Sequence, residues 1–400
     1  FLVGQEGFAE LRGEPASVRG LPDVFGYPAC LPQLMREAGV ESFYTTKLSW
    51  SAVTRFPHSS FVWRGHDGSE VLAHLTHEGG YNQEAKPEQL RNGVRAHRQA
   101  DVHPEFLAPT GFGDGGGGPT EEMCERVRRL SRLAGVPRPA WGRIEPFFAR
   151  LARLRRKLPV YQGELYLEYH RGTYTTHGAI KAAMRGAERA LQALEAVRCA
   201  TSGRPAPRED WRRTIFAQFH DYVTGSSIHE VYAEGRAELE ALSERSLRTA
   251  AAELGASRGE AAWFNPLPRP RTVARSVGKD GRVETAVLPP LSGAPVAALA
   301  AGPALTPVTA AARRLANGRV VAAFDEQGRV SALSIDGVSV ALAAPLGELV
   351  IHPDRPALFE AWDIDRPAMA LGVPVRSRAR IEVEQTDGRR ASLVCRRSLG

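Results

Sequence analysis

The sequence has few cysteines and no long apolar run, and both shortages limit the classes of protein that fit it. Four cysteines, Cys30, Cys124, Cys199 and Cys395, are scattered without Cys-x-x-Cys or zinc-finger spacing. That pattern favours a reduced, cytoplasmic setting. No stretch reaches the roughly 18 uninterrupted apolar residues that span a bilayer, because proline and glycine interrupt the apolar segment 286–312. We therefore expect no membrane partner.

Acidic residues are outnumbered, which leaves a formal net charge of +7. The excess comes from arginines distributed over predicted helices, as in residues 126–132 and 150–156, and this spread is typical of solvated helix faces. We expect no nucleic-acid partner. Nucleic-acid binding through the basic side chains is kept as a less favoured hypothesis, and it predicts a strongly salt-dependent affinity for DNA.

The patterns change twice along the chain and predict a multidomain α/β + α + β protein. Residues 1–120 alternate short apolar runs with helical patterns, which indicates a partial α/β domain with a mostly parallel, barrel-like sheet. Residues 121–257 are rich in helical patterns and predict a helical bundle as the middle domain. Residues 258–400 predict the start of a β-sandwich that is incomplete at residue 400.

Individual elements follow from the same patterns. Helices are predicted at residues 31–38, 120–133, 181–197, 208–219 and 228–254, and strands at 42–46, 70–76, 318–324 and 329–335. In the helix 208–219, helical spacing predicts one buried stripe of Trp211, Ile215, Phe216 and Phe219. The chain begins at Phe1 and ends directly after a strand-like run, so we expect a fragment of a longer protein.

Three short segments carry residues that can do chemistry. Residues 21–27 (LPDVFGY) place Asp23 in a loop before a helix, where it is either a cleft carboxylate or a helix cap. Residues 111–120 (GFGDGGGGPT) surround Asp114 with glycines, which fits close backbone approach to a ligand or a flexible linker. They lack the Gly-Lys-Ser/Thr of a phosphate loop. Residues 218–227 place His220 and Asp221 at a helix end, as metal ligands or as a hydrogen-bonded couple.

Two loop carboxylates and a His-Asp pair together allow a glycosidase site. Glycoside cleavage needs one carboxyl group as nucleophile or base and another as acid, and a metal ion can assist as a Lewis acid. The spacing alone selects no single hydrolase chemistry.

The same segments resemble glycoside hydrolase family 38, the class II α-mannosidases, and especially its bacterial and cytosolic branch. The resemblance rests on residues 21–27 (LPDVFGY), 44–50 (YTTKLSW), 61–71 (FVWRGHDGSEV), 111–120 (GFGDGGGGPT), 163–176 (GELYLEYHRGTYTT) and 219–232 (FHDYVTGSSIHEVY), in family order. Residues 315–337 and 359–365 (FEAWDID) resemble parts of the family's C-terminal domains. Residues 1–19 match nothing that we can place.

The resemblance implies a metal-dependent retaining exo-α-mannosidase. By that resemblance Asp23 is both nucleophile and metal ligand, Asp114 is the acid/base to within one position, and His220 is a second ligand of Zn²⁺, with Co²⁺ or another divalent cation as alternatives. It also implies substrate contacts from six residues: Phe25, Lys47, Tyr81, Asn82, His170 and Asp221. The residues alone leave other interpretations open: an exposed strand position for Lys47, a surface turn for Tyr81 and Asn82, and a core histidine for His170.

One part of the implied metal site is missing from this sequence. The family's metal site takes two more ligands from a His-x-Asp motif ahead of the nucleophile, and no histidine precedes His58 here. Two ligands are too few for a tight zinc site, so we expect the chain alone to be weakly active or inactive. The alternative is a carbohydrate-binding homologue without catalysis. The expected partner is a mannose-containing glycan, and a homo-oligomer is left open.

Overall fold

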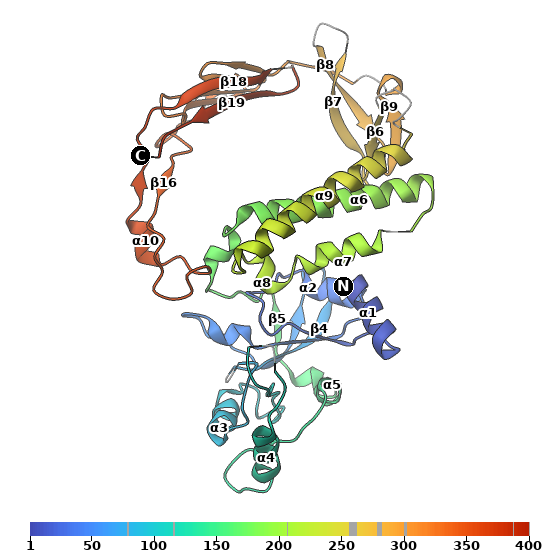
Figure 1. Ribbon diagram of the computed structural model, residues 1–400, viewed down its shortest axis with the longest axis vertical. Helices are drawn as coiled ribbons and strands as arrows, with labels where there is room; N and C mark the ends of the chain where they lie inside the picture. Colours follow the sequence, from blue (N-terminus) through green and yellow to red (C-terminus); the bar gives the residue numbers. More distant parts are fainter. Residues whose placement is uncertain are drawn as a thin grey trace. The chain divides into compact units, whose positions relative to one another are not determined.

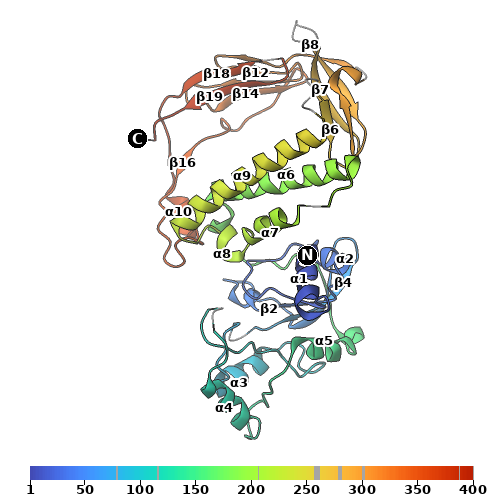
Figure 2. The same ribbon diagram turned by 45° about the vertical axis from the view of Figure 1, so that its right-hand side comes forward.

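The computed structural model describes residues 1–77, 80–114, 117–205, 207–255, 262–277, 282–299, 302–386 and 388–399. The chain divides into two compact units. The first contains Phe1–Thr176 together with Ala361–Asp363, and the second contains His177–Glu360 and Ile364–Gly400. Figures 1 and 2 show the elements of each unit.

A five-stranded sheet organises the first unit. Its strands are β1 (Val18–Gly20), β2 (Ser42–Thr45), β3 (Ser60–Arg64), β4 (Glu70–Leu75) and β5 (Val160–Gln162), in the order β1-β2-β4-β3-β5. The pairs β1–β2, β2–β4 and β3–β5 are parallel, and only β3–β4 is antiparallel. The predicted mostly parallel sheet is therefore confirmed. The described strands form an open sheet with β1 and β5 at its edges, and a barrel-like closure stays a prediction.

Two of the five helices of the first unit pack their apolar faces on this sheet, one through Leu31 and Met35 and the other through Phe147 and Leu151. The helices of the first unit are α1 (Leu2–Arg12), α2 (Leu31–Glu37), α3 (Pro87–Ala96), α4 (Glu121–Leu130) and α5 (Ile144–Ala152). Phe147 and Leu151 of α5 pack on Tyr44, Val62 and Leu72 of the sheet. A second cluster lies around Phe43 and Trp63, and both of these side chains are fully buried. Burial of this apolar surface stabilises the sheet that carries the site.

Long helices dominate the first half of the second unit. They are α6 (Gly178–Thr201), α7 (Arg208–Phe216), α8 (His220–Val223) and α9 (His229–Glu253). Figures 1 and 2 both show α6 and α9 side by side. Arg198 pairs with Glu253 at one end, while Ile180 and Tyr232 share a core cluster at the other. The two helices therefore run in the same direction.

The predicted stripe on the helix 208–219 is wrong. This helix ends at Phe216, and Phe216 and Phe219 are 71% and 52% exposed. The face that packs on α6 and α9 instead carries Trp211, Thr214 and Ala217. Helical spacing is compatible with burial of either face of this helix. The indole N–H of Trp211 donates to Glu195 of α6, and this hydrogen bond favours burial of the face with Thr214 and Ala217.

The remainder of the second unit is built from antiparallel strands. The strands are β6 (Ala262–Asn265), β7 (Arg271–Val277), β8 (Arg282–Leu288), β9 (Ser292–Pro295), β10 (Ala304–Leu305), β11 (Thr309–Ala311), β12 (Arg314–Ala316), β13 (Val320–Phe324), β14 (Val330–Ile335), β15 (Val338–Ser339), β16 (Val350–Ile351), β17 (Val373–Pro374), β18 (Arg380–Thr386) and β19 (Ala391–Arg396), with one short helix, α10 (Arg366–Ala370). The strands predicted at 318–324 and 329–335 are confirmed as β13 and β14, which lie in a meander with the order β11-β12-β13-β14-β15. A complete β-sandwich stays a prediction.

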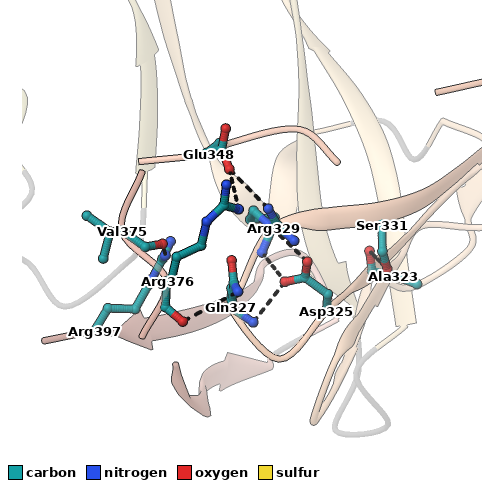
Figure 3. A network of polar contacts seen from close by, with 9 residues as sticks. All are labelled: Ala323, Asp325, Gln327, Arg329, Ser331, Glu348, Val375, Arg376 and Arg397. Atoms are coloured by element: carbon teal, nitrogen blue, oxygen red, sulfur yellow. Dashed lines mark hydrogen bonds and ion pairs between the residues drawn. The ribbon is translucent and has the colours of Figure 1, made fainter. Parts of the chain in front are cut away.

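A polar network fixes the turn between β13 and β14. Arg329 donates from Nε to Asp325 Oδ2 at 2.8 Å, and Asp325 also accepts the backbone N–H of Gln327 (Figure 3). Glu348 accepts from both Arg329 and Arg376, at 3.2 and 3.0 Å. The turn can close because Gly328 adopts a φ of 73°, which residues other than glycine rarely adopt.

No helix among the described residues is both long and apolar enough to cross a membrane.

Four histidines, His74, His77, His97 and His103, lie in β4 or in the segment that follows it. His74 and His103 are 0% and 2% exposed, and the ring of His97 lies 5.7 Å from that of His74 and 6.5 Å from that of His103. Burial lowers the pKa of each of these rings, and it lowers the pKa of His77 to about 4. Unfolding would return these rings to a pKa near 6.5.

Acid is therefore expected to destabilise the first unit. A group with a pKa of about 4 when folded and 6.5 when unfolded stabilises the fold fully above pH 6.5 and loses this contribution as the pH falls toward 4. For His77 alone the loss between pH 7 and pH 5 is about 2 kcal/mol. We expect thermal unfolding followed by circular dichroism to show a lower Tm at pH 5, with a smaller drop in His77→Gln. The exposed His66 provides the control His66→Gln, and an equal drop in all three proteins would contradict the assignment.

Candidate functional site

Three neighbouring parallel strands end at the same edge of the sheet, and each is followed by a predicted site residue. Asp23 follows β1, Lys47 follows β2, and Tyr81 follows β4 after a short loop. In an open α/β sheet the loops at the carboxyl ends of parallel strands lie together. This is the reason that residues nearly sixty positions apart meet here.

The loop that carries Asp23 is held at several points. The hydroxyl of Tyr27 donates to Leu21 O at 2.7 Å, and the backbone of Tyr27 exchanges hydrogen bonds of 2.8 and 2.9 Å with Leu165. Gly26 has a φ of 102°, and a Cβ there would lie 3.3 Å from the backbone of Leu165. The helix-cap interpretation of Asp23 is wrong, because Cys30 is the N-cap residue of α2.

Lys47 and Asp23 form an ion pair between Nζ and Oδ1. The Lys47 side chain is 1% exposed and that of Asp23 is 20% exposed, so the exposed-strand interpretation of Lys47 is wrong. Lys47 begins a short 3₁₀ helix, Lys47–Trp50, in which positions three apart lie on one side. Its ammonium group lies 3.7 Å from the ring centroid of Trp50 and 5.1 Å from that of Phe25. Cation–π attraction therefore supports the buried charge.

The hydroxyl of Tyr81 contacts both predicted catalytic carboxyl groups. It lies 3.1 Å from Oδ2 of Asp23 and also hydrogen-bonds Oδ1 of Asp114. Burial raises the pKa of Tyr81, and the hydrogen bond to Asp114 and the charge of Asp23 add to that shift. Tyr81 is therefore neutral and keeps its proton at pH 7. A purely flexible linker would not explain this contact of Asp114 with Tyr81. Two glycines of the same loop, Gly115 and Gly116, lie outside the described residues.

His170 is buried next to Phe25. Its ring lies 4.7 Å from that of Phe25 and 6.3 Å from that of Trp50. Asp363 Oδ1 accepts from the backbone N and the Nδ1 of His170, at 2.7 and 3.0 Å. Burial lowers the pKa of His170, and the Asp363 carboxylate opposes this shift. The interpretation as a buried histidine is therefore confirmed, and contact of His170 with a substrate stays a prediction.

The contacts described above do not include three predicted residues. Asn82 is exposed beside Tyr81, and among the described residues its side chain makes no hydrogen bond to another predicted site residue. His220 and Asp221 belong to α8 in the second unit, where His220 Nε2 lies 3.5 Å from Asp221 Oδ2. The roles predicted for these three residues stay predictions.

The donors that the structure describes do not complete a metal site by themselves. Within the described ranges, no three His, Cys, Asp or Glu side chains converge in a way that could hold a metal ion. Tetrahedral zinc sites use three or four protein ligands. Lys47 also pairs with one oxygen of Asp23, which is the predicted ligand of the first unit. Zinc shared by Asp23 and His220 therefore stays a prediction.

Sequence reasoning gave no role to four residues of this cluster. They are Trp50, Tyr169, Trp362 and Asp363, all of which contact Lys47 or His170. Trp50 had a signal, since it follows Lys47 by three residues in the quoted segment YTTKLSW. Trp362 and Asp363 lie about 190 residues from their partner in the sequence, and their segment carries no spacing that indicates the contact.

Paired loop carboxyl groups beside aromatic rings, at the carboxyl edge of an α/β sheet, fit the needs of a sugar-cleaving hydrolase. Residues 1–164 match the Glycosyl hydrolases family 38 N-terminal domain, and residues 168–256 match the Alpha mannosidase middle domain. The first match includes residues 1–19, so the expectation that this stretch has no counterpart in the family is wrong. The chain belongs to glycosyl hydrolase family 38.

Curated proteins with similar sequences carry mannosidase names. "Alpha-mannosidase 2C1" of Homo sapiens is 34% identical over 418 residues, which cover 97% of this chain and 40% of the relative. "Alpha-mannosidase G" of Dictyostelium discoideum is 39% identical over 240 residues, which cover 58% of this chain and 22% of the relative. The match to the human relative covers nearly all of this chain but only about 40% of the length of that relative.

A solved structure shares the fold. An alpha-mannosidase from Enterococcus faecalis V583 superposes with a TM-score of 0.70 at 14% sequence identity, over 98% of this chain and 55% of that structure. At this identity the likeness shows the fold, which is mixed α/β and multidomain.

The buried ion pair predicts strong energetic coupling between its partners. Removing one charge leaves the other partly buried without compensation, which typically costs about 3–5 kcal/mol, whereas removing both costs much less. We expect Lys47→Met and Asp23→Asn to lower the free energy of unfolding far less in combination than the sum of the single effects. Urea unfolding followed by tryptophan fluorescence measures this coupling.

The exposed pair of Arg236 and Glu240 on α9 is the matched control, and we expect its coupling to be much smaller. Additive effects of Lys47→Met and Asp23→Asn would show that the two charges do not depend on each other.

Proposed function

We propose that this chain carries the catalytic carboxyl groups of a retaining exo-α-mannosidase that hydrolyses terminal α-mannosides through a glycosyl-enzyme intermediate. The contact of one hydroxyl, that of Tyr81, with both Asp23 and Asp114 is the main support. Because Asp23 Oδ2 and Asp114 Oδ1 both contact the Tyr81 oxygen, the distance between these two carboxyl oxygens cannot exceed the sum of the two contact distances. That separation favours the roughly 5–5.5 Å of retaining enzymes over the roughly 6.5–9.5 Å of inverting ones.

In the first step, Asp23 attacks the anomeric carbon while Asp114 gives its proton to the leaving oxygen, and the glycosidic C–O bond breaks. In the second step, Asp114 takes a proton from water as the water oxygen attacks the same carbon and releases Asp23. The ammonium of Lys47 pairs with Oδ1 of Asp23 and thereby holds this carboxyl group in one orientation.

Tyr81 also links the positions of the two carboxyl groups. Its hydroxyl has one proton to donate and lies within hydrogen-bond distance of both of them. One ionised and one protonated carboxyl is the state that begins a retaining reaction. Phe25 and Trp50 offer ring faces on which the apolar face of a sugar can pack.

The second unit enters the proposal through His220, as a metal ligand, and Asp221, as an acceptor for sugar hydroxyls. Zn²⁺ or Co²⁺ is proposed as the ion, and no step above depends on it. A cytoplasmic location is likewise proposed, from the cysteine pattern.

The second candidate function is mannose binding without catalysis. The observation in its favour is that Lys47 pairs with Asp23, the proposed nucleophile, at Oδ1. This alternative predicts saturable binding of methyl α-mannoside with no release of an aryl leaving group.

Hydrolysis of 4-nitrophenyl α-mannoside, with and without added Zn²⁺ or Co²⁺, tests the proposed activity. We expect Asp23→Asn to lower kcat by about 10³-fold or more, because loss of a nucleophile removes the covalent route. Asp67→Asn, in an exposed turn of the same unit, is the control and should retain activity. Binding without hydrolysis in the unaltered protein would favour the second candidate, and neither binding nor hydrolysis would refute both.

Tyr81→Phe tests the connection between the two carboxyl groups. The variant keeps the ring and removes the hydroxyl, so we expect kcat to fall about 10–100-fold with KM changed by only a few fold. Tyr161→Phe is the matched control, since the Tyr161 hydroxyl donates to Glu164 O at 2.9 Å, away from the site. A fall in kcat of equal size in both variants would argue against a specific role for Tyr81.

A further inference from the structure

Three residues from late in the chain, Ala361–Asp363, belong to the first unit and lie along the turn that follows His170. Thr176 Oγ1 donates to Ala361 O at 3.2 Å. A Cβ at Gly172 would lie 2.7 Å from Trp362 O, so the two backbones are in close contact there. Asp363 completes the series with its hydrogen bonds to His170. The segment is therefore fastened to the turn at three successive positions.

Asp363 controls both the backbone and the ring of His170. His170 has a φ of 56°, a left-handed conformation that residues other than glycine seldom adopt. The backbone N–H of His170 donates to Asp363 Oδ1 at 2.7 Å, and the Nδ1 of the ring lies 3.0 Å from the same oxygen. A carboxylate accepts and cannot donate, so Nδ1 must carry the ring proton. The second ring nitrogen, Nε2, then holds the lone pair of the neutral imidazole.

The ring that Asp363 fixes is packed among the aromatic residues of the sugar site. Trp362 lies 4.8 Å from the His170 ring and 5.4 Å from the ring of Phe25. Phe25 and Trp50 in turn face the ammonium group of Lys47, which pairs with Asp23. Contiguous contacts thus connect Asp363, through His170, Phe25 and Lys47, to the proposed nucleophile.

We propose that Asp363 is a positioning residue of the mannoside site: it holds His170 in the Nδ1–H tautomer and in one ring orientation, and His170 holds the rings that form the sugar-binding wall. The inference rests on the proposed function for its effect on mannosides. Its effect on His170 is independent of that function. Asp363→Ala is then expected to weaken mannoside binding about tenfold and to leave the His170 ring as a mixture of tautomers.

Nitrogen NMR of the full chain, labelled with ¹⁵N-histidine, tests the tautomer directly at pH 7.5. The signals of His170 are assigned by their loss in His170→Gln. We expect one protonated nitrogen and one lone-pair nitrogen in the unaltered protein, and averaged signals in Asp363→Ala. Asp363→Asn should largely restore the unaltered pattern, because a single amide oxygen can accept both hydrogen bonds that Oδ1 accepts now.

Asp365→Ala is the matched control. Asp365 lies two residues along the same segment, and its Oδ2 accepts the backbone N–H of Ala357 at 2.8 Å. We expect its His170 signals to be unchanged. Gly172→Ala is the second variant, which keeps every side chain named above but pushes its new methyl group against Trp362 O; it should shift the His170 signals even if Asp363→Ala does not fold.

Affinity for methyl α-mannoside, measured by calorimetry on the same proteins, separates the possible failures. Unchanged His170 signals in both Asp363→Ala and Gly172→Ala would overturn the proposal, as would altered signals with mannoside affinity within twofold. Equal effects of Asp363→Ala and Asp365→Ala would reduce the role to general stability and overturn it as well. If the unaltered protein binds no mannoside, the proposed function fails, and the NMR signals alone decide whether Asp363 positions His170.

Discussion

The site in the first unit is arranged around a buried positive charge. The ammonium of Lys47 is removed from water, and it is stable there because Asp23 supplies a carboxylate and Phe25 and Trp50 supply ring faces. An isolated charge in such a position would be strongly unfavourable. The ion pair with Lys47 therefore adds to the backbone contacts that hold the Asp23 loop, and Tyr81 joins this loop to Asp114.

The sheet makes this arrangement possible through the direction of its strands. Because β1, β2 and β4 are parallel neighbours, the loops that follow them share one edge. Strand β3 runs the other way and ends at the opposite edge, so the hairpin it forms with β4 supplies core residues such as Trp63. The loops after the three parallel neighbours carry the site residues, while side chains of β2, β3 and β4 all contribute to the core.

Much of this could be predicted from residue patterns and from the family resemblance. Proline, glycine and apolar periodicity located α2, α6, α9 and the β13–β14 turn to within a few residues, because local sequence largely determines such elements. The site residues Asp23, Phe25, Lys47, Tyr81, Asp114 and His170 were found by resemblance, and the structure brings them together in one unit. Their roles in catalysis stay predictions. Periodicity failed at α7, where Phe216 and Phe219 fit a helical stripe as well as Thr214 and Ala217 do. No local rule could find Asp363, because its partner is defined only by the folded chain.

The path of the backbone through the two units limits how the protein can be divided into fragments. The first unit takes residues from both sides of a stretch of more than 180 positions that belongs to the second, since Ala361–Asp363 follows Glu360 and precedes Ile364. A single contiguous peptide that contains all of the first unit must run from Phe1 to Asp363. A polypeptide that stops at Thr176 would keep Asp23, Lys47, Tyr81 and Asp114, yet it would lack the carboxylate that accepts the backbone N–H of His170.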